Sequence, residues 1–304
     1  MPDYVQLARV VCVATGKGGV SKTSLTANAA GLAAAAGHRT LLIDLDPQGD
    51  LSDDLGYFNH PALDEGRHLA NAMLSGTPLQ TVITNVRANL DVIPGGEHLS
   101  DVSGALLARQ ARGRASFDLL AECLAPLAGD YDLIFIDTPP TDDTLQLLAL
   151  SASRWLLIPT KADTSSIRAI QRIAARVAEA RSADHALDIL GVVLVGVPTA
   201  ATRVRSAAEQ DIHQLLGDVA PLFDRGIRDS AAVARETRSQ GVLVHELAEK
   251  VEGAEPFWKS LRSGTTPSQR LPGSAPALAD DYVRVTEQIL LRIDELENAA
   301  TGAA

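Results

Sequence analysis

The sequence predicts an α/β fold with a doubly wound, mostly parallel β-sheet and helices on both of its faces. Three observations predict it. Short apolar runs rich in β-branched residues alternate with segments of helical periodicity from residue 9 to about 217. Several runs are continuously apolar, which is typical of strands that are buried on both faces. A glycine-rich segment links the first run to an Ala- and Leu-rich helix, a connection that favours parallel α/β folds.

Each predicted element follows from its own residues. The strands are the apolar runs RVVCVAT (9–15), TLLIDL (40–45), LDVIP (90–94), YDLIFID (131–137), RWLLIP (154–159) and ILGVVLVGV (189–197). The helices are the segments whose apolar residues recur every three or four positions, at 23–36, 98–109, 115–128, 143–151, 165–181 and 203–216. Because strands and helices alternate along the chain, the simplest arrangement is one sheet with helical crossovers.

The C-terminal part changes character. Pro, Gly and Ser dominate 253–277, which predicts an irregular insert or surface loop. Its Phe257 and Trp258 either anchor the loop on the body or dock a partner. Residues 278–299 regain an apolar stripe, which predicts a helix that packs back on the sheet. We therefore expect one α/β domain over 1–252, followed by the insert and a returning helix of that domain.

Composition excludes several classes of protein. The 304 residues are 46% hydrophobic and 21% charged, which excludes wholesale disorder. The net charge of −11 argues against a surface that binds nucleic acid all over and leaves a local basic patch open. The two cysteines are too far apart in sequence to predict a disulfide framework or a zinc site. No apolar stretch has the length of a bilayer and no leader is visible, so a cytoplasmic location is expected.

The strongest motif is GKGGVSKTS, which follows the first strand and opens the first helix. Glycines let a backbone wrap closely around an anion, and the N–H groups at a helix start attract negative charge. We expect Lys22 to neutralise the β- and γ-phosphates and Thr23 to offer its hydroxyl to Mg²⁺. The predicted nucleotide-binding loop comprises Gly16, Lys17, Gly18, Gly19, Val20, Ser21, Lys22, Thr23 and Ser24.

Three carboxylates lie where predicted strands end. Asp137 closes one apolar strand, and Asp44 and Asp46 lie two residues apart where another runs into a loop. Ligands of such sheets bind at the carboxyl ends of the strands. A carboxylate there can hold the shell of a Mg²⁺ ion that bridges two phosphates.

These motifs resemble those of the ParA/MinD family of P-loop ATPases. KGGVSKTS is similar to the family's deviant Walker A motif, in which the first lysine, here Lys17, is the signature. Two further family motifs are similar to DLDPQGD (44–50) and IFIDTPP (134–140). The family's adenine-side loop and the helix after it more loosely resemble residues 223–244, and this resemblance places Arg225 near the nucleotide. The resemblance covers about 9–250 and the last helix, and the DPQG segment favours the ParA branch.

The resemblance implies an activity and its partners. It implies a P-loop NTPase fold and slow, partner-stimulated hydrolysis of ATP to ADP with Mg²⁺. Asp46 would position or activate the attacking water. The Mg²⁺ ion would be held by Thr23, Asp44, Asp46 and Asp137. Lys17 would reach the phosphates of the other subunit in an ATP-bound homodimer. Lys17, Lys22 and Asp46 are the implied catalytic residues. The expected partners are nonspecific double-stranded DNA and a ParB-type centromere-binding protein, with a nucleoid-associated location and no membrane.

Two positions depart from the family pattern. Ser21 stands where the family usually has glycine, and a positive φ there costs a side chain about 1 kcal/mol, whereas a cap geometry suits serine. Asp50 stands where asparagine usually follows DPQG and adds a negative charge near the site. We expect nucleotide to bind nonetheless, because the other elements of the loop are intact.

DNA binding needs local positive charge, because it depends on contacts to phosphates. Six arginines balance six acids between 200 and 240, a window that is basic relative to the whole chain. The candidate DNA-binding residues are Arg203, Arg205, Arg235 and Arg238. Arg168, Arg172 and Arg176 recur every four residues, which is more typical of a solvated helix face.

Three other functions remain open at this point. A MinD-like ATPase that positions machinery on a membrane is one, although the terminal helix is acidic and a membrane-surface helix should be basic. An iron–sulfur assembly relative is another, although it should bring a cysteine pair. The third is a nucleotide-dependent binding module with negligible turnover, which the departures at Ser21 and Asp50 would permit.

Overall fold

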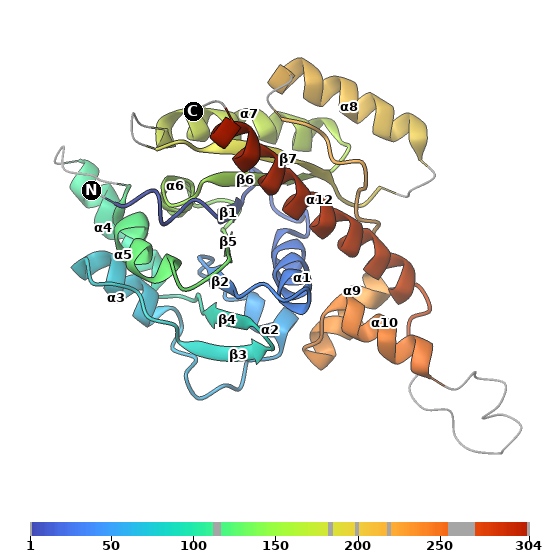
Figure 1. The fold of residues 1–304 in the computed structure, drawn as a ribbon, viewed down its shortest axis with the longest axis horizontal. Helices are drawn as coiled ribbons and strands as arrows, with labels where there is room; N and C mark the ends of the chain where they lie inside the picture. Colours follow the sequence, from blue (N-terminus) through green and yellow to red (C-terminus); the bar gives the residue numbers. More distant parts are fainter. Residues whose placement is uncertain are drawn as a thin grey trace, which may run out of the picture.

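A computed structural model describes residues 2–111, 117–181, 185–197, 201–217, 220–254 and 271–302. Within these ranges, seven strands form one sheet in the order β3-β4-β2-β5-β1-β6-β7 (Figure 1). Neighbouring strands are parallel except for the antiparallel pair β3 and β4. The predicted fold, a doubly wound and mostly parallel sheet, is therefore confirmed.

All six predicted strands are present, and one was missed. The strands are β1 (Val10–Val13), β2 (Thr40–Asp44), β3 (Ile83–Arg87), β4 (Leu90–Ile93), β5 (Leu133–Asp137), β6 (Trp155–Thr160) and β7 (Asp188–Leu194). The missed strand, β3, is a short and half-exposed edge strand that lacks a continuous apolar run. Its signal was the short connection to β4, where Asn89, a residue type common in turns, takes a φ of 61°.

Helices connect the strands in the predicted places. They are α1 (Lys22–Ala35), α2 (Leu51–Leu55), α3 (Arg67–Ser75), α4 (Leu99–Gln110), α5 (Leu119–Ala128), α6 (Asp143–Ser151), α7 (Thr164–Ala180), α8 (Thr202–Leu216), α9 (Ala231–Gln240), α10 (Val244–Gly253) and α12 (Ala275–Gly302). The helices α2, α3 and α10 were not predicted. The predicted helix over 115–128 begins at Leu119, and its first two residues lie outside the described ranges.

The sheet separates two apolar cores. Along β1, Val10 and Cys12 pack on the side of α3 to α8, whereas Val11 and Val13 pack on the side of α1, α10 and α12. This alternation is the strand periodicity of two residues. Both faces are apolar because helices cover both faces (Figure 1). Cys12 and Cys123 are buried free thiols.

The last helix returns to the body of the protein. α12 packs on α1 and α10, and its Asp281 is 1% exposed. The Arg228 guanidinium donates to both Asp281 oxygens at 2.6 and 2.8 Å and thereby ties the loop before α9 to α12. The insert predicted at 253–277, with Phe257 and Trp258, lies mostly outside the described residues.

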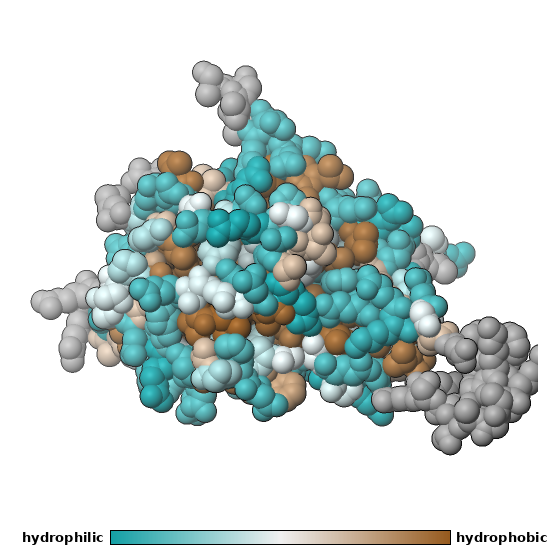
Figure 2. Space-filling model, turned by 60° about the horizontal axis from the view of Figure 1, so that its bottom comes forward, coloured by the Kyte–Doolittle hydropathy of each residue, from teal (hydrophilic) through white to brown (hydrophobic). Residues whose placement is uncertain are grey.

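The outer surface is mainly polar. Figure 2 shows one face, on which hydrophilic residues predominate and hydrophobic ones lie in small groups. In the part of the chain that the structure describes, no helix has both the length and the apolar character that a membrane crossing requires.

Candidate functional site

The site lies where β1, β2 and β5 end at the carboxyl edge of the sheet. β1 neighbours β5 and β6, and the chain winds outward from it in both directions, so the loop after β1 lies at the topological switch point. Asp44 of β2 and Asp137 of β5 are paired in register as the last residues of their strands. The tertiary fold thus brings the phosphate loop and the predicted carboxylates to one place.

A pocket of about 190 Å³ occupies this edge. Its walls are residues 17–24 of the phosphate loop, together with Asp46, Asp50, Pro140 and Arg238. The loop leads into α1, which begins at Lys22, so the first N–H groups of that helix lie at the pocket. An anion in this pocket would therefore face the helix N-terminus that the sequence predicted.

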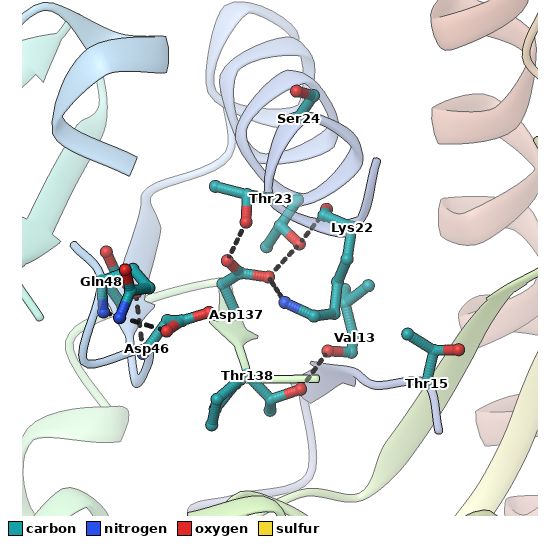
Figure 3. Close-up of polar contacts among 12 residues, drawn as sticks. Val13, Thr15, Lys22, Thr23, Ser24, Asp46, Gln48, Asp137 and Thr138 are labelled. Carbon is teal, nitrogen blue, oxygen red and sulfur yellow. Dashed lines mark hydrogen bonds and ion pairs between the residues drawn. The ribbon is translucent and has the colours of Figure 1, made fainter. Parts of the chain in front are cut away.

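Lys22 and Thr23 both bond to Asp137 (Figure 3). Lys22 is 6% exposed, and its Nζ lies 3.0 Å from Asp137 Oδ1. The Thr23 hydroxyl donates to Asp137 Oδ2 at 2.7 Å, and the Thr26 hydroxyl, which sequence reasoning missed, donates to Oδ1 at 3.2 Å. The buried carboxylate is thus neutralised by the lysine that is predicted to bind phosphate.

Asp44 and Asp46 form the other wall of the site. Asp44 Oδ1 accepts the Asp46 N–H at 2.9 Å, and Asp46 Oδ1 accepts the Gln48 N–H at 3.0 Å. Burial raises the pKa of both carboxyls, and the nearby Asp137 raises that of Asp44 further. Among the described residues, no donor reaches the buried Asp44 Oδ2.

These groups suit a Mg²⁺ ion. Asp44 has a buried oxygen without a partner, and the neighbouring donors are carboxylate and hydroxyl oxygens. Mg²⁺ prefers oxygen ligands and is held by one or two carboxylates plus the phosphates of a substrate. A divalent cation would also offset the repulsion between Asp44 and Asp137 that raises the Asp44 pKa.

Ser21 adopts the left-handed conformation, with φ 52° and ψ 35°, and its side chain makes no cap hydrogen bond. Of the two geometries that the sequence left open, the structure has the one with a positive φ, which places the side chain close to the following carbonyl. The backbone requires this φ because the chain must turn from the loop into α1.

Ser21→Gly is expected to raise the free energy of unfolding by about 1 kcal/mol, because glycine adopts a positive φ without steric penalty. Chemical denaturation followed by circular dichroism measures the change. The matched control is Ser100→Gly on α4, where φ is not positive and glycine should cost about 0.5 kcal/mol. Equal destabilisation by both substitutions would contradict the assigned strain.

Lys17, the signature lysine, bonds within its own chain. Its Nζ lies 3.0 Å from Asp163 Oδ1, 2.6 Å from the Ser165 hydroxyl and 3.1 Å from the Ser166 hydroxyl. Hydrogen bonds from Ser165, Lys17 and Ser166 lower the pKa of Asp163. Sequence reasoning missed these partners, although Asp163 lies three residues after the end of β6 and caps α7, which is a recognisable signal.

Helix α7 is fastened to the phosphate loop beyond that contact. Arg172 Nη2 donates to the Gly16 carbonyl at 2.6 Å. A Cβ on Gly16 would lie 2.7 Å from the Ala169 carbonyl oxygen, so glycine is required for α7 to pack this closely. Arg168, one turn earlier, is exposed.

Gln146 connects the phosphate loop to the segment after β5. It is fully buried, and its Nε2 donates to the carbonyls of Thr15 at 3.2 Å and Pro139 at 2.5 Å. Arg176 of α7 donates to Gln146 Oε1. Of the arginine series on α7, Arg172 and Arg176 therefore support the pocket rather than a solvated face.

The four candidate DNA-binding arginines are not brought together. Arg203 and Arg235 are exposed, but α8 and α9, which carry them, lie apart with α12 between them (Figure 1). Arg205 donates to the Phe223 carbonyl, and Arg238 lines the phosphate pocket. The returning helix thus separates segments that are close along the chain, and DNA binding by these arginines stays a prediction.

Arg225 also lies outside the phosphate pocket. It lines a separate hollow of about 460 Å³ with Arg284, Gln288, Leu291 and other residues of α12. The structure thus does not bring Arg225 to the residues of the phosphate loop. The contact between Arg225 and the nucleotide, which the loose resemblance implied, stays a prediction.

Comparisons with known proteins agree with the fold and the motifs. A family model described as an AAA domain matches residues 8–189. The chromosome partitioning protein ParA of Caulobacter vibrioides is 30% identical over 262 residues, which are 84% of this chain and 92% of that protein. ParA of Myxococcus xanthus is 33% identical over 172 residues, which are 56% of this chain and 58% of that protein. The solved structure of Cyanthece apo McdA has a TM-score of 0.72 at 21% identity and covers 93% of this chain and 99% of its own. The chain belongs to the ParA/MinD family of P-loop ATPases.

Proposed function

We propose that this protein is a ParA-like ATPase that forms ATP-dependent dimers, binds nonspecific DNA and drives DNA partition with a ParB-type partner. The observation that carries the proposal is a pocket of about 190 Å³ that the phosphate loop and Asp46 line together. Lys22 and Thr23 of that loop bond to Asp137, which is the register partner of Asp44. Relatives that are named chromosome partitioning proteins support the ParA branch.

In this proposal each side chain has a separate task. Lys22 leaves Asp137 and binds the phosphates of ATP. Asp137 and the Thr23 hydroxyl then become available as ligands for Mg²⁺. When bound, Mg²⁺ would supply positive charge that offsets the negative charge of the phosphates. Asp46, a largely buried residue of the pocket wall, orients or deprotonates the attacking water. Lys17 leaves Asp163 and contacts the phosphates of the second subunit.

Dimerisation is tested by light scattering of the protein with Mg²⁺ and either ADP or a non-hydrolysable ATP analogue. A dimer with the analogue and a monomer with ADP are expected, together with binding of both nucleotides by calorimetry. A monomer in both conditions would contradict the dimer mechanism. Absence of binding by either nucleotide would contradict the assignment of the pocket itself.

DNA binding is tested with a nonspecific duplex at several salt concentrations. Binding should require ATP and weaken with salt, because it depends on phosphate contacts. Arg203→Glu and Arg235→Glu are the informative variants, since both side chains are exposed, whereas Arg205 and Arg238 have partners inside the fold. Unchanged affinity in the double variant would remove these two residues from the DNA surface.

A further inference from the structure

Arg238 lies at the phosphate pocket although its helix, α9, is remote from the loop in sequence. It forms part of the pocket wall with residues 17–24, Asp46 and Asp50. Val233 and Thr237 of α9 are buried, and their packing fixes the orientation of the helix and thereby the side chain that it presents at the pocket. The position of Arg238 is therefore set by helix packing.

A buried carboxylate holds the Arg238 guanidinium in place. Arg238 Nε donates to Asp54 Oδ1 at 2.9 Å, and the Ser24 hydroxyl of the phosphate loop donates to Asp54 Oδ2 at 2.9 Å. Asp54 is 6% exposed, whereas Arg238 is 48% exposed. The buried end of the pair is thus rigid, and the guanidinium extends from it towards solvent at the pocket.

Most of the donors of Arg238 remain available. A guanidinium has five N–H groups, of which the Nε–H is used here. Across the described parts of the chain, no acceptor bonds to the two terminal nitrogens of Arg238. A planar guanidinium matches two oxygens of a phosphate, which makes arginine suited to bidentate phosphate binding.

The pocket contains acidic side chains, so a further cation near them would favour the binding of a negatively charged nucleotide. Asp46 and Asp50 line it, and the two lysines of the loop are already paired, Lys17 with Asp163 and Lys22 with Asp137. A nucleotide adds several negative charges to this acidic site. Arg238 is positively charged, half-exposed and fixed at the wall, so it can meet an incoming phosphate without leaving Asp54.

We infer that Arg238 is a nucleotide-binding residue whose terminal nitrogens contact the phosphate chain of ATP and ADP. This inference rests on the proposed function only in taking the pocket to be the nucleotide site. It assigns to the nucleotide an arginine that the sequence had assigned to DNA. It also gives Asp54 a role, since that carboxylate positions Arg238 and joins it to Ser24 of the loop.

The test is calorimetric titration with ADP and with a non-hydrolysable ATP analogue, each with Mg²⁺ and without DNA. Arg238→Ala is expected to raise both dissociation constants about tenfold, the usual scale for one charge-assisted contact. It should also make affinity less dependent on salt, because one ionic contact is lost. Arg238→Lys keeps the charge without the planar fork and should bind with intermediate affinity. Arg168→Ala, the same change at an exposed arginine on α7, should bind like the wild type.

The outcomes separate the possible causes. Thermal unfolding of each apo variant shows whether it is folded, and a folded Arg238→Ala with wild-type affinity for both nucleotides would overturn the inference alone. Equal weakening by Arg168→Ala would overturn it as well, because the effect would then reflect net charge. If wild-type protein binds neither nucleotide, the assigned function of the pocket fails, and the inference fails with it.

Discussion

Asp46→Ala is expected to lower the rate of ATP hydrolysis about 100-fold or more while leaving ATP bound. A positioned acid–base group contributes about 10²- to 10⁴-fold to a rate, and Asp46 is a pocket carboxylate with no side-chain partner among the hydrogen bonds described. Its Oδ1 accepts only the Gln48 backbone N–H, so alanine removes little that holds the fold. The measurements are phosphate release and calorimetric binding of ATP.

The same variant tests the order of dimerisation and hydrolysis. If hydrolysis ends the dimer, Asp46→Ala with ATP should remain dimeric by light scattering for longer than the wild type. The matched control is Asp53→Ala, which removes an exposed carboxylate from nearby α2 and should hydrolyse ATP at the wild-type rate. Wild-type turnover by Asp46→Ala would show that another group positions the water.

Lys22→Met is expected to weaken nucleotide binding about 100-fold or more and to destabilise the apo protein. The first effect reflects the loss of a charged donor to the phosphates. The second arises because Asp137, which is fully buried, loses the cation at 3.0 Å. Breaking a buried ion pair costs about 3–5 kcal/mol, because the remaining charge stays buried without compensation.

A double variant separates these two effects. Lys22→Met with Asp137→Asn leaves no uncompensated charge from the pair, so its free energy of unfolding should return to within about 1 kcal/mol of the wild type. Nucleotide binding should remain lost, because neither substitution restores a cation. Denaturant titration and calorimetry give the two readings. Recovery of binding in the double variant would mean that Lys22 acts on Asp137 and not on phosphate.

The residues that could be predicted are those whose signal is local. The order of strand, glycine-rich loop and helix predicted the position of Lys22 and Thr23, because a phosphate loop is encoded in consecutive residues. Asp44 and Asp137 were predicted because each ends an apolar strand, and parallel strands place their carboxyl ends at one edge. Both arguments need only the type of element and its direction.

The residues that were missed or misplaced depend on how helices pack. Asp163 and Ser166 meet Lys17, and Gln146 meets Thr15, through α7 and α6, and no local pattern specifies which distant loop each helix packs against. The edge strand β3 was missed because half-exposed strands lack a continuous apolar run.

The sequence by itself determined the fold class, the family motifs and the phosphate loop, because each is carried by local periodicity or by consecutive residues. The tertiary structure decided which charges meet. It pairs Arg238 with Asp54 at the pocket and Lys17 with Asp163, and it places α12 between α8 and α9, which carry the candidate arginines. An ion pair needs its two charges within a few ångströms of each other, and the paired residues here are distant in the chain. Their pairing therefore follows from how the elements pack and not from the spacing of residues along the sequence.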